Sequence, residues 1–279
     1  MYVDALIDRQ KDIIHVVERK DGKRVFVDHP ARYVFYYKDS RGKFESIFGD
    51  KLERVVTTSG KNFAKEKKLY SSQRLFESDV NPVFRCLADN YLGADTPKLQ
   101  QAFFDIEVDF DKDKGFADPS DPFNPVTAIS VHLDWIGKTI CLVNKPKTLT
   151  KADAQTIVNR FEDTILIDTE DELLSTFLDL IEDADVMSGW NSEGFDIPYM
   201  VNRIARVLGK EHTRRFCLWG QYPKKREFER YGKAQETFDT VGRLHLDYME
   251  LYRKYTYHEM HSYSLDAIGE YELGERKTE

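Results

Sequence analysis

The chain has 279 residues, with 41 Lys and Arg against 49 Asp and Glu, and a formal net charge of −8. A 41% hydrophobic share with 13% aromatic residues excludes a disordered chain and is enough to build the core of two modest domains or one large one. No apolar run approaches the ~18 residues of a membrane span, the charged N-terminus is unlike a signal peptide, and three widely spaced cysteines exclude a disulfide scaffold, so we expect a cytoplasmic protein.

The first part of the chain, residues 1–98, is expected to form a small β-rich α+β domain. Asp21-Gly22 is a turn signal. Aromatic or β-branched runs predict strands at residues 32–37, 44–48 and 52–57. Residues 61–68 predict a loop or an exposed helix, and residues 80–92 predict a helix that stops at Gly93. Gly, Asp, Thr and Pro then cluster, so we place the domain boundary within residues 93–98.

The second part, residues 99–279, alternates predicted strands with predicted helices. Strands are expected at residues 102–108, 128–135, 139–143, 164–168, 186–188 and 244–248. An apolar stripe predicts a helix after Thr169, with Glu172 completing a capping box, and a second stripe has Pro198 in its first turn. Ser264 is expected to cap a last helix. This order predicts an α/β mixed sheet with helices on both faces.

Charge is unevenly distributed along the second part. Residues 201–233 hold ten basic and three acidic side chains, and residues 105–121 hold seven acidic and two basic ones. A basic stretch beside an acidic cluster is typical of phosphate attraction next to a cation site, although two solvated surfaces would give the same counts.

Two carboxylates share one face of a predicted strand. Asp105 and Glu107 are two residues apart, so their side chains point to the same side while Phe104 and Ile106 point to the core. Like charges at this spacing repel one another unless a cation lies between them, and hard divalent ions prefer oxygen ligands.

A second acidic position follows about ninety residues later. Asn191, Phe195 and Asp196 lie in a segment between a short predicted strand and an amphipathic helix. Asp196 by itself would also suit a helix N-cap, but the sequence around it, Gly-Trp-Asn before and Phe-Asp-Ile-Pro-Tyr after, is more elaborate than a cap requires.

Together these segments resemble the first and second exonuclease motifs of family B DNA polymerases of the T-even bacteriophage type. Supporting similarity lies in residues 76–85, 246–252 and 263–269. The resemblance implies a ribonuclease H-like exonuclease domain at 99–279, preceded by the family's N-terminal domain at 1–98. It also implies proofreading of DNA by 3′-5′ hydrolysis, and the cytoplasm of an infected cell for a phage-encoded protein.

The resemblance further implies a site for two Mg²⁺ or Mn²⁺ ions held by Asp105, Glu107 and Asp196 as catalytic residues. Phe116 is similar to a phenylalanine that stacks on the terminal base, unless it packs onto the core. Asn191 would bind substrate or fix its loop, and Phe195 would pack in the core close to the substrate. Tyr231, Gly232 and Lys233 resemble the tip of a hairpin that helps to part primer from template.

One family motif has no counterpart in this sequence. The third exonuclease motif is Tyr-x-x-x-Asp, whereas Tyr263 and Asp266 are three residues apart rather than four. The polymerase palm is absent too. We therefore expect a portion of a longer polymerase or the product of a divided gene, with the C-terminal polymerase portion and DNA as partners. Alone, the chain is expected to be a weak or inactive exonuclease.

Two other functions fit the same sequence. Asp247 or Asp266 would supply the fourth carboxylate of a standalone exonuclease, which would then trim DNA without a partner. A non-catalytic nucleic-acid-binding fragment would bind DNA without binding divalent ions.

Overall fold

The computed structural model describes residues 1–113, 115–230 and 232–276, and the side chains of Arg230 and Lys233 lie outside the described part. The chain divides into two compact units, Met1–Lys98 and Leu99–Glu279. No helix within the described residues is long and apolar enough to cross a membrane.

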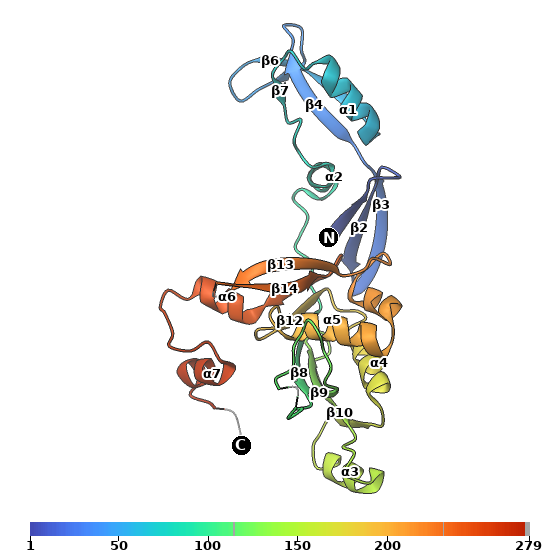
Figure 1. Ribbon diagram of the computed structural model, residues 1–279. Coiled ribbons are helices and arrows are strands. Elements are labelled where there is room, and N and C mark those ends of the chain that lie inside the picture. Colours follow the sequence, from blue (N-terminus) through green and yellow to red (C-terminus); the bar gives the residue numbers. More distant parts are fainter. Residues whose placement is uncertain (114, 231, 277–279) are drawn as a thin grey trace. The chain divides into compact units, whose positions relative to one another are not determined.

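The first unit consists of two antiparallel sheets and two helices (Figure 1). One sheet has the order β1-β2-β3 and the other β5-β6-β4-β7. The strands are β1 (Tyr2–Asp8), β2 (Ile13–Lys20), β3 (Lys23–Pro30), β4 (Tyr33–Lys38), β5 (Phe44–Glu45), β6 (Lys51–Thr57) and β7 (Leu75–Phe76), and the helices are α1 (Gly60–Leu69) and α2 (Pro82–Tyr91). The β-rich character expected of this part is therefore confirmed.

Local chemistry sets several boundaries in this unit. The turn between β2 and β3 uses positive φ at Asp21 and Gly22, as a two-residue hairpin turn requires. β5 is shorter than the strand predicted over 44–48, because the Ser46 hydroxyl accepts hydrogen bonds from the N–H groups of Phe48 and Asp50 and turns the chain. Asn81 begins α2 by accepting from the N–H of Val83.

The second unit is built on a six-stranded mixed sheet in the order β11-β10-β9-β8-β12-β15. The strands are β8 (Gln101–Val108), β9 (Val126–Leu133), β10 (Lys138–Asn144), β11 (Thr164–Ile167), β12 (Val186–Gly189) and β15 (Leu244–Asp247). β8, β9 and β10 pair antiparallel, whereas β12 is parallel to both β8 and β15. A separate hairpin consists of β13 (Lys224–Arg230) and β14 (Lys233–Asp239). The predicted α/β class is confirmed.

Helical segments accompany these strands or follow them in the described part of the second unit. They are α3 (Lys151–Val158), α4 (Glu170–Leu180), α5 (Asp196–Val207), the 3₁₀ segment η1 (Lys210–Phe216), α6 (Tyr248–Tyr255) and α7 (Leu265–Leu273), with a further tight turn at Gly209. α4 contacts β9 and β10, and α4 and α5 lie beside the central strands (Figure 1). Their buried faces share one core with Phe104, Ile106 and Phe177. Burial of such side chains supplies most of the stability of a sheet–helix layer.

Three local expectations need correction. Thr169 precedes α4 as predicted, but its side chain makes no capping hydrogen bond, so the capping box is wrong. Phe195, rather than Asp196, stands at the N-cap of α5, and Asp196 is its first helical residue. Helix α6 was not predicted: the strand expected at residues 244–248 ends at Asp247, whose side chain accepts from the N–H of Met249 and begins the helix.

Candidate active site

The face of β8 that points away from α4 and α5 carries two carboxylates. Asp105 and Glu107 are exposed. Phe104, which precedes Asp105, and Ile106, which lies between the two carboxylates, are almost fully buried. Asp105 pairs across the sheet with Ser130 of β9, so its neighbour on this face is small and polar. The alternation predicted from sequence therefore holds residue by residue.

Asp196 reaches this strand from the start of α5, although ninety residues separate the two in sequence. Its Oδ1 accepts a hydrogen bond of 3.2 Å from the N–H of Ile106, the residue between Asp105 and Glu107. Only 3% of Asp196 is exposed. The structure thus brings Asp196 to the backbone of β8 at the residue between Asp105 and Glu107.

Burial and charge give Asp196 an unusual proton affinity. Desolvation and, next, repulsion by Asp105 raise its pKa from 3.8 to about 7, and Asp247 adds a smaller repulsion. The backbone N–H of Ile106 acts in the opposite direction but does not compensate. A bound cation would relieve this repulsion.

The donor chemistry of these side chains suits a hard divalent ion, since all are carboxylate oxygens. Within residues 1–113, 115–230 and 232–276, however, no three His, Cys, Asp or Glu side chains are grouped closely enough to hold a metal ion. Asp105 repels Asp196 electrostatically, whereas Glu107 is exposed on the same face of β8 as Asp105. The chemistry of the Asp105–Asp196 pair fits a divalent ion, and a third donor of the same type, Glu107, lies on the same face of β8, so the three-carboxylate ion site stays a prediction.

The loop before Asp196 follows the end of β12 and is hydrogen-bonded to Asp247 at the end of β15. Asn191 has φ of +60°, a conformation that Asn tolerates better than most residues. Its carbonyl accepts from the N–H groups of Gly194 and Phe195. Gly189 is required where β12 passes β8, since a Cβ there would lie 2.6 Å from the carbonyl oxygen of Phe104.

Phe195 packs against the core, and its ring stacks on that of Tyr199 with centroids 5.3 Å apart. Phe116, by contrast, is 90% exposed, and its ring is an edge-on neighbour of Phe110 at 6.3 Å. Phe116 therefore presents a free aromatic face instead of packing onto the core.

The loop that carries Phe116 is hydrogen-bonded to α5 at residues that shortly precede β9. Asn202 donates to the carbonyl of Pro119, and Arg203 donates to the carbonyls of Pro122 and Phe123. Arg203 is buried in an ion pair with Glu170 of α4. The same helix thus starts with Asp196 and anchors the chain that follows Glu107.

The predicted hairpin is present as β13 and β14, and Gly232 occupies the turn with φ of +70°. Tyr231 and the side chain of Lys233 lie outside the described residues, so these two sites stay predictions. Many basic side chains of 201–233 are engaged in ion pairs, with partners that include Glu170, Asp121, Asp179, Glu193 and Glu236. The count of ten basic residues therefore overstates the charge available to a ligand.

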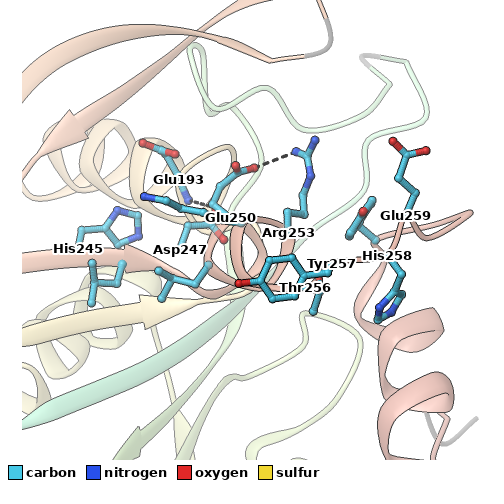
Figure 2. A pocket seen from close by; sticks show the side chains of 13 residues that line it. Glu193, His245, Asp247, Glu250, Arg253, Thr256, Tyr257, His258 and Glu259 are labelled. Atoms are coloured by element: carbon cyan, nitrogen blue, oxygen red, sulfur yellow. Dashed lines mark hydrogen bonds and ion pairs between the residues drawn. The ribbon is translucent and has the colours of Figure 1, made fainter.

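Sequence reasoning missed the part that Asp247 has in this site, where it appeared only as an optional fourth ligand. Asp247 stands at the end of β15, directly beside Gly189 of β12. Only 6% of it is exposed. A pocket of about 780 Å³ opens next to it; Figure 2 shows Glu193, His245 and Asp247 together at one end and Tyr257, His258 and Glu259 at the other.

Comparison with known proteins agrees with this geometry. The family model described as DNA polymerase family B, exonuclease domain, matches residues 53–268. The chain is 32% identical over 210 residues to the DNA-directed DNA polymerase of Escherichia phage RB69, which covers 67% of this chain and 23% of that protein. It is 33% identical over 112 residues to the polymerase of Enterobacteria phage T4, covering 39% of this chain and 12% of that protein.

A more distant similarity covers more of the chain. DNA polymerase 1 of Saccharolobus solfataricus is 25% identical over 252 residues, or 86% of this chain and 25% of that protein. The chain thus spans a quarter or less of the length of these relatives. From the position and extent of the family match, the chain belongs to the family B DNA polymerases and contains their exonuclease domain.

Proposed function

We propose that this chain is the proofreading part of a DNA polymerase, and that it removes the 3′-terminal nucleotide of DNA by metal-assisted hydrolysis. The observation that carries the proposal is the hydrogen bond from Ile106 to Asp196, which joins the two separated acidic motifs at one point of the sheet. The first unit, Met1–Lys98, would then be the N-terminal domain of the polymerase.

In this proposal each side chain has a separate task. Asp105 and Asp196 would hold Mg²⁺ or Mn²⁺, and Glu107 would orient the attacking water from the same face of β8. Two bound ions would lower the pKa of that water and stabilise the leaving 3′ oxygen. Phe116 stacks on the terminal base. Stacking makes no hydrogen bond to a base edge, so the site accepts any base.

A larger polymerase portion is the partner that we propose for the chain. An apolar groove of about 400 Å³, lined by side chains that include Phe103, His132 and Trp190, lies directly beside Asp105 on the open face of the sheet. A segment of that portion packed there would supply the fourth carboxylate and exclude water from the site. Such a protein would act on DNA in the cytoplasm of an infected cell.

The test is hydrolysis of a 3′-labelled single-stranded oligonucleotide in Mg²⁺. We expect weak trimming by the chain alone, and at least a tenfold gain when the matching polymerase portion is added. Asp196→Asn should abolish both activities, whereas the matched variant Asp134→Asn, which alters an acceptor for the N–H of Gln101 at the other end of β8, should keep them. Trimming that survives Asp196→Asn would refute the proposed site. DNA binding without any hydrolysis, even with the polymerase portion, would favour a binding fragment.

A further inference from the structure

Asp247 is surrounded by backbone N–H donors of the loop that leads to Asp196. Its Oδ1 accepts from the N–H of Asn191 at 3.0 Å, and its Oδ2 accepts from the N–H of Glu193 at 3.1 Å. Oδ1 also accepts from the N–H of Met249 at 2.9 Å and so caps α6. One buried carboxylate therefore ties the loop after β12 to the helix after β15.

The connection from this carboxylate to Asp196 is short. The carbonyl of Asn191 accepts from the N–H of Phe195, and the carbonyl of Ser192 accepts from the N–H of Ile197; these two donors stand on either side of Asp196 at the start of α5. Ser192 is fully buried and its hydroxyl is 2.9 Å from Nε2 of His245, which adds a side-chain contact to the same strand β15. Movement of the loop would therefore move the first turn of α5, and Asp196 with it.

Charge-assisted hydrogen bonds to backbone N–H groups are stronger than neutral ones, and a buried carboxylate without them would be costly. Three accepted N–H bonds direct the Asp247 oxygens to the loop and to α6, which differs from the arrangement expected of a metal ligand that faces the scissile phosphate.

We propose that Asp247 is a positioning residue: it holds the loop over residues 190–195 so that Asp196 meets β8 between Asp105 and Glu107. The effect on catalysis rests on the proposed exonuclease function, whereas the effect on loop geometry does not. This assignment replaces a fourth-ligand role for Asp247.

The test compares Asp247→Asn and Asp247→Ala with Asp185→Asn in the full chain. Asp185 is 1% exposed and accepts from the N–H of Gln100, but it precedes β12, at the opposite end of that strand. It is therefore a matched buried carboxylate remote from Asp196. Hydrogen exchange of the Asn191, Glu193 and Ile106 amides is the first readout, because the Ile106 N–H reports directly on Asp196 and requires neither metal nor activity.

We expect faster exchange at all three amides in both Asp247 variants and no change in Asp185→Asn. An asparagine keeps one acceptor oxygen, so its effect should be smaller than that of alanine. Mn²⁺ affinity should fall several-fold in Asp247→Asn. In the complex with the polymerase portion, kcat should fall about tenfold for asparagine and about a hundredfold for alanine, with KM for the oligonucleotide unchanged, as misplacement of a reacting group predicts.

Unchanged exchange at Ile106 in Asp247→Ala would overturn the proposal, as would equal losses of kcat in Asp247→Asn and Asp185→Asn. Complete loss of Mn²⁺ binding in Asp247→Asn with normal exchange at all three amides would also overturn it, because that result would make Asp247 a ligand. A wild-type chain that trims no DNA even with the polymerase portion would refute the proposed function, while the exchange rates would still decide the role of Asp247 in the loop.

Discussion

The two faces of β8 have the same backbone but different tasks. On one face Phe104 and Ile106 are packed under α4 and α5, and on the other Asp105 and Glu107 are open to solvent. The first face stabilises the sheet by burial of apolar area. The second concentrates negative charge, which costs stability until a cation binds. The folding face and the proposed ligand-binding face therefore alternate from one residue of the strand to the next.

This difference predicts that substitutions on the two faces have opposite consequences. On the open face, Asp105→Asn should lower kcat for 3′ trimming by about 10³-fold, since a carboxylate ligand contributes several kcal/mol to the transition state. The same change removes a repulsion from Asp196, so stability in urea should be equal to that of the wild type or higher. An activity loss that is accompanied by unfolding would mean that the open face also supports the fold.

On the packed face, Phe104→Ala should destabilise the second unit by about 3–5 kcal/mol. Truncation of this buried side chain leaves a cavity and removes the ring contact with Phe177. Urea unfolding of the full chain measures this loss. Phe161→Ala is the matched control, since Phe161 is 61% exposed. A loss below about 1 kcal/mol would show that this face is not the principal core.

The pH dependence of stability should reveal the repulsion on the open face. The folded-state pKa of Asp196 is raised to about 7, so its protonation stabilises the folded state. This contribution to the free energy of unfolding is complete below pH 3.8 and is lost as the pH rises through about 7. Without metal, the wild type should therefore lose a few kcal/mol relative to Asp196→Asn between about pH 4 and pH 8. Urea titrations of both proteins measure the difference, and Mn²⁺ should reduce it. A difference independent of pH would contradict the raised pKa.

The smallest predicted effect concerns Phe116, which is exposed and contributes little to the fold. Phe116→Ala should weaken binding of a single-stranded 3′ end by about 1–3 kcal/mol through loss of base stacking, with no change in stability. Fluorescence of a 3′-terminal 2-aminopurine gives the affinity in Ca²⁺, which prevents hydrolysis. Equal affinity of the variant would remove Phe116 from the site.

Much of this arrangement could be predicted from the sequence. The alternation around Asp105 gave the correct face for each residue of β8, and the apolar stripe after Asp196 gave α5. Both signals are local, since strand period and helix period are readable within a short window. The proximity of Asp196 to Asp105 came from the family resemblance, because no local pattern relates residues ninety positions apart.

What the sequence did not provide depends on distant partners. Arg203 appeared as one of ten basic residues, but its guanidinium is buried against Glu170 of another helix. Thr169 occupies a capping position without making the capping bond. Asp247 looked like an available acid, yet its oxygens accept from N–H groups more than fifty residues earlier in the chain. Such pairings are properties of the folded chain, so they require coordinates.

The most direct test of the account is a crystal structure of the chain with Mn²⁺ and a short 3′-ended oligonucleotide. The anomalous signal of Mn²⁺ should lie between Asp105 and Asp196, with Glu107 turned toward it and the terminal phosphate within reach. A signal elsewhere on the sheet, or none at concentrations that support trimming, would contradict the claim that these separated acidic residues hold one shared divalent charge.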